Sequence, residues 1–400
     1  DKRAKMSARV QRALCCILVT IACSVFLLSF TPNLVAELSS SHWRVVSRLT
    51  KHSPYHLGWN VNELTNYKCE TIGSWQTSRF NATQKKSSSS TSASPNVTSE
   101  TAPLLCGLNT FECIKQTSWI NQCAKSCVSG RGPVQRIVHV IQIGDTMGFT
   151  QWLSIMSAIR FLQPRVVFLH HIGKLSTCWA RRIQCHPLVR LNAVQRSSLP
   201  TALNGASVQF VAHLSDFIRT AALWQYGGVY MDVDAILTKP FDPLLMAEAV
   251  FSQQIGGTIG NGLIVARKNS CFICAYSQRM CKDYDGSWDK HSVLAVTSLL
   301  GNTTRYPGVT VLPHKSGFFP FSWYADDLTS LFKRAANASR FSPSDVYAIH
   351  LFSSGLKAHG LTSATRFAAI GSSKTPYALA ARSVLPPSFN ASHADETKCL

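Results

Sequence analysis

The sequence predicts an α/β protein with a mostly parallel central sheet. From residue 136 onward, short apolar runs alternate with segments of helical periodicity. Parallel strands are joined by helical crossovers, so this alternation indicates βαβ units. The runs are almost continuously apolar, as expected for strands buried on both faces. A hydrophobic content of 46% is enough for a sizeable core.

The first half of this region alternates regularly. The expected strands are 136–143, 165–170 and 189–194, and the expected helices are 149–162 and 179–184. A longer helix follows, for which Ser215 is the expected N-cap. Gly227 and Gly228 should end it, because glycine adopts positive φ at little cost.

The second half begins with the apolar run 229–237, which predicts a short buried strand. The further expected strands are 249–253, 262–266 and 346–352, and further helices are expected at 241–245, 270–282 and 292–300. Gly260, Asn261 and Gly262 are expected in the connection between two of these strands.

Two carboxylates interrupt the run 229–237. At strand period, Asp232 and Asp234 would point to the same face. Two buried carboxylates on one face repel each other and are costly to desolvate. A divalent cation such as Mn²⁺ or Mg²⁺ resolves this, because it prefers hard oxygen ligands. Taken alone, the D-x-D pattern also fits a solvated turn.

The pattern around these aspartates, SDxxR–x₆–YGGVYxDxD from Ser215 to Asp234, resembles the DxD sugar-nucleotide transferases of glycosyltransferase family 32. The resemblance covers roughly residues 137–356 and implies a GT-A nucleotide-sugar fold and retention of anomeric configuration. It also implies a nucleotide-sugar donor, a glycan, glycolipid or glycoprotein acceptor, and bound Mn²⁺ or Mg²⁺.

The same resemblance implies roles for individual side chains. Asp232 and Asp234 would be catalytic and would bind the metal, with His350 as the third metal ligand. The donor would contact Asp216, Arg219, Asp232, Asn261 and Gly262. Tyr230 has the same strand parity as the two aspartates and is therefore also expected to line the donor pocket. Asp289, in the stretch WDKH, is the expected catalytic group on the acceptor side.

Each assignment has a plainer alternative. Asp216 and Arg219 could form a surface ion pair three residues apart on a helix. Asn261 and Gly262 could be an ordinary turn. His350 could be a structural histidine, since the chain continues with SSGL where many family members have a tryptophan-rich segment.

The N-terminal part predicts a membrane anchor. Basic residues precede 18 uncharged residues, 13–30, which is long enough to span a thin bilayer with the N-terminus in the cytosol. A cleavable signal peptide is the alternative. We expect a cytosolic tail at 1–12, a signal anchor at 13–35, a stem at 36–133, a catalytic domain at 134–365 and a C-terminal extension at 366–400.

Sequons and cysteines favour a luminal, Golgi-type location. Five N-glycosylation sequons follow the apolar run, and 11 of the 14 cysteines lie beyond it. The sequons are at Asn81, Asn96, Asn302, Asn337 and Asn390.

The net charge of +20 raises the possibility of nucleic-acid binding. The basic residues are scattered, however, and the anchor, sequons and cysteines conflict with such a partner. The predicted function is therefore a metal-dependent retaining glycosyltransferase. A catalytically inactive lectin on the same fold is the alternative.

Overall fold

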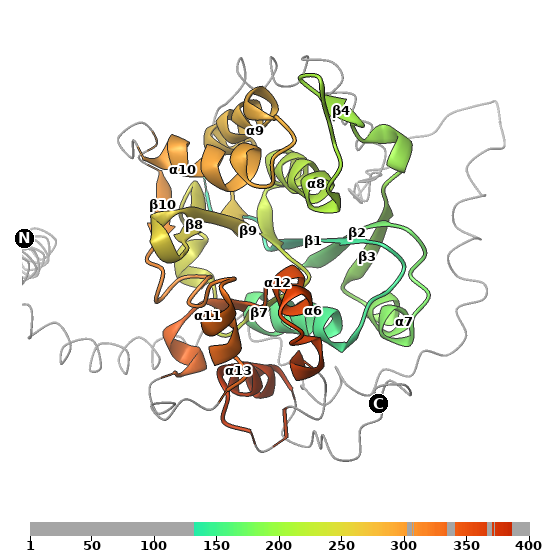
Figure 1. Ribbon diagram of the computed structural model, residues 1–400, viewed down its shortest axis with the longest axis vertical. Helices are drawn as coiled ribbons and strands as arrows, with labels where there is room; N and C mark the ends of the chain where they lie inside the picture. The colour runs from blue at the N-terminus through green and yellow to red at the C-terminus, as the bar shows by residue number, and fades with distance from the viewer. Residues whose placement is uncertain are drawn as a thin grey trace, which may run out of the picture. The chain divides into compact units, whose positions relative to one another are not determined.

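The computed structural model describes residues 132–301, 306, 308–333, 341–365, 370–371 and 373–385 (Figure 1). The predicted tail, anchor and nearly all of the stem lie outside these residues. Among the described residues, no helix is both long and apolar enough to cross a membrane.

A seven-stranded sheet forms the centre of the described region, in the order β10-β8-β9-β6-β1-β2-β3. Its strands are β1 (Ile137–Ile143), β2 (Val166–Ile172), β3 (Val189–Ala193), β6 (Gly228–Met231), β8 (Ala249–Gln253), β9 (Ile259–Ala266) and β10 (Val309–Leu312). The pairs β1–β2, β2–β3, β1–β6 and β8–β10 are parallel, whereas β9 runs antiparallel to both β6 and β8. The predicted α/β class and mostly parallel sheet are confirmed.

Helices cover both faces of this sheet (Figure 1). One face packs against α6 (Phe149–Leu162), α7 (Cys178–Cys185) and α13 (Pro376–Val384), and the other against α8 (Val211–Tyr226), α9 (Cys271–Asp283) and α10 (Ala295–Leu300). Side chains of one strand alternate between the two cores, as strand geometry requires: Val140 belongs to the first core and Ile141 to the second.

Smaller elements complete the fold. A two-stranded antiparallel sheet joins β7 (Ala235–Leu237) to β11 (Ala348–His350), and a hairpin joins β4 (Ala202–Leu203) to β5 (Ala206–Ser207). The short helices α11 (Ala325–Ser330) and α12 (Ser353–Ala358) flank β11 in the sequence. Because β7 follows the D-x-D residues directly, its pairing with β11 brings a distant segment to them.

The glycine pair between α8 and β6 has no room for side chains. Gly227 has φ +66°, and an added Cβ would lie 2.5 Å from the Lys268 backbone nitrogen. Gly228 has φ +111°, and its Cβ would lie 2.4 Å from the Ile137 carbonyl oxygen. These glycines allow the chain to pass directly from α8 into the sheet beside β1, as the sequence predicted for the helix end.

Three local expectations were wrong. Helix α8 begins at Val211 with Phe210 as N-cap, so Ser215 lies inside the helix. The run 229–237 is two strands, β6 and β7, separated by a turn in which the Ala235 N–H bonds the Asp232 carbonyl. Asn261 and Gly262 lie inside β9. In the last two cases, a local apolar or glycine pattern could not show which partner strand the backbone would pair with.

Strand β10 and helices α11 to α13 were not predicted. Helix α13 falls within residues 366–400, the predicted C-terminal extension, yet it packs into the first core. Tyr377 and Ala380 on this helix are fully buried. The hairpin strands β4 and β5 were not predicted either. The remaining strands and helices of the catalytic region lie close to their predicted positions, and 149–162 and 249–253 coincide with α6 and β8.

Candidate active site

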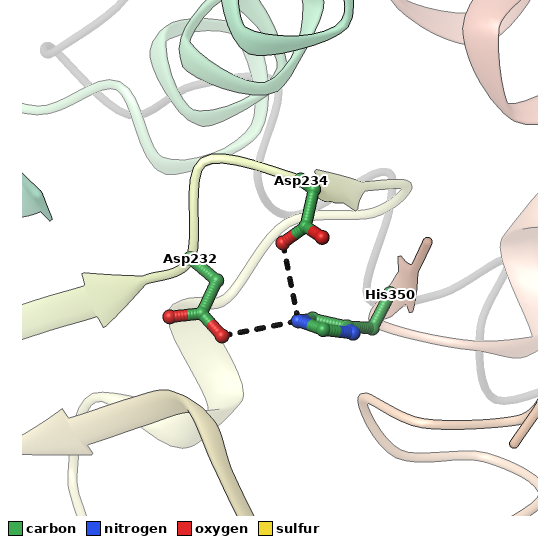
Figure 2. A group of neighbouring side chains, drawn as sticks. All are labelled: Asp232, Asp234 and His350. Carbon is green, nitrogen blue, oxygen red and sulfur yellow. Dashed lines mark hydrogen bonds and ion pairs between the residues drawn. The ribbon is translucent and has the colours of Figure 1, made fainter. Parts of the chain in front are cut away.

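Asp232, Asp234 and His350 form a compact cluster of oxygen and nitrogen ligands (Figure 2). The His350 Nε2 atom lies 3.1 Å from Asp232 Oδ2 and 3.2 Å from Asp234 Oδ1. One potential ligand atom from each residue lies within 4.8 Å of the others. The two aspartates face one point because of the turn between β6 and β7, and not because of strand parity.

His350 reaches the aspartates through the pairing of β11 with β7, which places it opposite Ala235. Its ring packs against Phe352 and Phe319, with ring centroids 4.3 Å and 5.6 Å away. Burial by itself would lower the pKa of His350. The Asp234 charge and the hydrogen bonds to both carboxylates outweigh burial and raise this pKa to about 10. A positive charge is therefore strongly favoured at this point.

Asp234 is anchored by the backbone that follows His350. Its Oδ2 accepts a hydrogen bond of 2.7 Å from the Ser353 N–H at the start of α12. Burial opposes ionisation, but His350 and Ser353 hold the pKa of Asp234 well below its usual range. Asp234 Oδ2 is thus held by the backbone, and Oδ1 is directed toward His350.

Gly262 on β9 forms the floor of this cluster. Its carbonyl accepts the Asp232 N–H at 2.7 Å. A Cβ at this position would lie 2.6 Å from Asp232 Oδ2 and 3.0 Å from His350 Nε2. At Gly262 the backbone of β9 therefore passes directly beside the candidate metal-ligand atoms of Asp232 and His350.

A second cluster surrounds Arg219 on α8. Its guanidinium lies 3.2 Å from Asp216 Oδ1 and 3.3 Å from Asp232 Oδ1. It also donates to the Asn261 carbonyl at 2.6 Å, and its Cζ lies 4.4 Å from the Tyr230 ring centroid. Only 4% of Arg219 is exposed. The alternative of a surface ion pair is therefore wrong.

Tyr230 joins the Arg219 cluster to the carboxylate cluster. It points from β6 into the core beneath α8 and donates a short hydrogen bond to Asp232 Oδ1. Asp232 therefore has Oδ1 occupied by Tyr230 and Arg219, and Oδ2 turned toward His350. Burial opposes the charge of Arg219, but Tyr230, Asp232 and Asp216 more than offset this and raise its pKa, so it stays protonated.

Asp216 lies one helical turn from Arg219 and is 5% exposed. Its Oδ1 accepts a hydrogen bond of 2.9 Å from the Asn261 side chain, and its Oδ2 lies 3.1 Å from His291 Nε2. Burial opposes ionisation, but Arg219 and His291 keep the pKa of Asp216 below its usual value.

The structure brings together eight of the nine residues expected at the site. Asp289 is the exception: within the described part of the chain, its carboxylate makes no hydrogen bond or ion pair, and the residue precedes a π-helical turn, Lys290–Leu294. Three site residues were not predicted: His291, Ser353, and Ser215, whose Oγ bonds Arg219 at 3.1 Å. Their closeness in sequence to Asp289, His350 and Asp216 was the available signal.

The chemistry of the carboxylate cluster fits a divalent metal. Two carboxylates and an imidazole are ligands that Mn²⁺ accepts, and the carboxylates also suit Mg²⁺. Asp234 and His350 are each 8% exposed, so the negative charges are poorly compensated by water. The absence of a side chain at Gly262 leaves room beside Asp232 and His350.

Comparison with known proteins adds independent information. Residues 186–251 match a family model described as the glycosyltransferase sugar-binding region containing the DXD motif. Glucan organizing enzyme 1 of Cryptococcus neoformans var. grubii serotype A is 26% identical over 226 residues, covering 53% of this chain and 58% of that protein. The chain therefore spans somewhat more than half the length of this curated relative.

Among solved structures, the chain is similar to PaToxG glycosyltransferase, with 16% identity, a TM-score of 0.34, and coverage of 69% of this chain and 95% of that one. It is also similar to galactosyltransferase LgtC in complex with donor and acceptor sugar analogs, with 14% identity, a TM-score of 0.32, and coverage of 54% and 87%. The family model and the curated relative fit a glycosyltransferase of the family 32 kind, with its DXD sugar-binding region at residues 186–251, as the sequence motif indicated.

Proposed function

We propose that this protein is a metal-dependent, retaining glycosyltransferase of the GT-A fold. It transfers a sugar from a UDP- or GDP-linked donor to a hydroxyl group of a glycan, glycolipid or glycoprotein. The observation that carries the proposal is the convergence of both D-x-D carboxylates, which lie within the matched sugar-binding region, on His350 of β11.

Asp232, Asp234 and His350 would hold Mn²⁺ or Mg²⁺. When bound, the metal neutralises the departing diphosphate and orients it. Tyr230 and Arg219 hold Asp232 Oδ1, so that Oδ2 remains directed toward the metal position. Arg219 is buried and already has five partners, so we assign it mainly to positioning the carboxylates. Asp216 and Asn261 would face the donor sugar.

The acceptor is proposed to be a glycan or glycan-bearing molecule. Asp289, on the turn next to His291, remains a proposed acceptor-side group. A glycan acceptor is in keeping with a relative that is named for glucan organization.

We place the reaction in the Golgi lumen, with the chain held by its N-terminal anchor. The five sequons and the 11 cysteines beyond the apolar run support an oxidising, glycosylating compartment. Endoglycosidase digestion of the expressed chain should lower its apparent mass. An unchanged mass, with the C-terminus open to protease in intact microsomes, would contradict this location.

The function is tested by incubating the purified full-length chain with common UDP- and GDP-sugars and Mn²⁺. We expect slow hydrolysis of one donor, and none after chelation of the metal. The alternative, an inactive lectin on the same fold, predicts glycan binding with no hydrolysis of any donor. The complete set Asp216, Arg219, Asp232 and Asp234 favours the enzyme.

A further inference from the structure

His291 is a fully buried histidine that lies outside the sequence motif and contacts it directly. Its Nε2 atom is 3.1 Å from Asp216 Oδ2. The two residues are 75 positions apart in the sequence and belong to α8 and to the π-helical turn Lys290–Leu294. Single π-helical turns are often found at functional sites.

The two oxygens of Asp216 have different partners. Oδ1 accepts from Asn261 at 2.9 Å and lies 3.2 Å from Arg219. Among the described residues, Oδ2 is bonded by His291 alone. A carboxylate oxygen can accept more than one hydrogen bond. Oδ2 therefore keeps capacity for one further donor, and His291 fixes the rotation of the carboxylate together with the two partners of Oδ1.

The His291 ring is held firmly by its surroundings. It packs edge-on against His213, with ring centroids 4.2 Å apart, and against Tyr284 at 5.0 Å. The His213 Nδ1 atom in turn is 2.9 Å from the Tyr284 hydroxyl. The ring therefore cannot follow Asp216 if that carboxylate turns, so it acts as a fixed donor.

One nitrogen of the His291 ring is expected to reduce the stability of the fold. Its Nδ1 atom is buried and has no hydrogen-bond partner within the described region. A buried polar atom without a partner destabilises a fold, and it calls for an explanation other than packing. An aromatic residue without nitrogen would fill the same space at lower cost, so the useful part of this ring is Nε2.

We propose that His291 is a positioning residue that orients Asp216 so that Oδ2 accepts a hydrogen bond from a hydroxyl group of the donor sugar. The inference rests on the proposed function and adds a residue to it. It also links the turn that carries Asp289 to the donor side of the site. His291 acts through Asp216 and need not touch the sugar.

The role of His291 can be tested by comparing the binding of nucleotide-sugars with that of nucleotides. His291 should matter for the sugar moiety of the donor and not for the nucleotide. The measurement is calorimetry on the full-length chain with Mn²⁺, comparing UDP with UDP-hexoses and GDP with GDP-mannose. The affinity ratio of nucleotide-sugar to nucleotide reports contacts with the sugar alone.

Three variants separate hydrogen bonding from packing. His291→Phe keeps the ring and removes the donor. His291→Gln places an amide N–H near the Nε2 position, whereas the shorter His291→Asn reaches only the Nδ1 position. We expect the sugar-to-nucleotide affinity ratio to fall about ten-fold in the Phe and Asn variants, which corresponds to one hydrogen bond to a charged group, and to recover in Gln. Nucleotide affinity should stay within about two-fold of wild type, because the nucleotide makes no contact that depends on this hydrogen bond.

His186→Phe is the matched control, because it replaces another buried histidine, at the end of α7 and outside the site. It should leave the affinity ratio unchanged. An unchanged ratio in His291→Phe and His291→Asn overturns the proposal, as does an equal loss of nucleotide and nucleotide-sugar binding in all three variants. A wild-type chain that binds no nucleotide or nucleotide-sugar overturns the proposed function and this inference with it, whereas the other two outcomes leave the proposed function intact.

Discussion

Asp232 belongs to two clusters that differ in how completely their charges are satisfied. Around Arg219, one cation lies between two carboxylates, and hydroxyl and amide groups fill the remaining positions. Around His350, two carboxylates share a single imidazole, and the Ser353 N–H is the further partner that Asp234 has there. Each cluster sets two carboxylates against one cation. The first holds them with many further hydrogen bonds and leaves acceptor capacity only at Asp216 Oδ2, whereas the second relies on one imidazole and one backbone N–H.

The difference indicates a division of labour. A closed, buried network holds its members in one geometry, because every displaced group would lose partners that water cannot replace. In the open cluster two carboxylates repel each other, and a bound cation would relieve this repulsion. Asp232 connects the two clusters, since its Oδ1 belongs to the closed network and its Oδ2 to the open one.

The largest effect is expected from Asp234→Asn, which removes one ligand charge from the open cluster and keeps the side-chain volume. Donor turnover at limiting Mn²⁺ should fall by more than about a hundred-fold, since even groups behind a metal ligand can cost that much. Asp242→Asn, which alters an exposed carboxylate paired with Arg136, is the control. Undiminished turnover in Asp234→Asn would rule out Asp234 as a ligand.

Arg219→Lys tests the closed network. Lysine keeps the charge but cannot reproduce the planar fork that reaches Asp216, Asp232 and Asn261 together. Loss of one charge-assisted bond costs about 1.5–3 kcal/mol, or roughly ten- to a hundred-fold in kcat/KM for donor turnover. The loss should appear with every acceptor. If turnover is present in the wild type and unaffected in this variant, the role of Arg219 proposed above is wrong.

Gly262→Ala tests whether metal binding at the open cluster requires a residue without a side chain at position 262. The new methyl carbon would lie 2.6 Å from Asp232 Oδ2, which is too close for van der Waals contact, so the carboxylate must shift. The apparent affinity for Mn²⁺ should therefore fall about ten-fold, as for other distortions of metal ligands. Gly301→Ala is the matched control, since a Cβ there would meet no atom of the described residues closer than 3.5 Å. Equal Mn²⁺ affinity in both variants would place the metal elsewhere.

The smallest effect is expected from Tyr230→Phe, which removes one of the groups on Asp232 Oδ1 and leaves Arg219 in place. Because Tyr230 donates to a carboxylate that keeps a second partner, turnover should fall only about three- to ten-fold. A metal titration then distinguishes two outcomes. A weaker Mn²⁺ response supports Asp232 as the link between the clusters, whereas an unchanged response contradicts it.

Much of the site could be predicted because its residues are close together in the sequence. Asp216 and Arg219 share a helix face, and Tyr230 and Asp232 follow from the strand after the glycine pair. Periodicity and glycine chemistry determine such local relations. Ser215 was misplaced as a helix cap for the same local reason: its side chain suits a cap equally well, and only its contact with Arg219 reveals its position in the second turn of α8.

The α/β alternation, the glycine-bounded passage from α8 to β6 and the identity of most polar residues at the site could all be inferred from the amino-acid sequence. How these residues meet depends on the three-dimensional fold. The D-x-D residues converge through a turn, His350 arrives from 118 residues away through the pairing of β11 with β7, and His291 reaches Asp216 across 75 residues. The physical reason is that periodicity specifies an element and its buried face, whereas the register between distant elements depends on packing of the whole core.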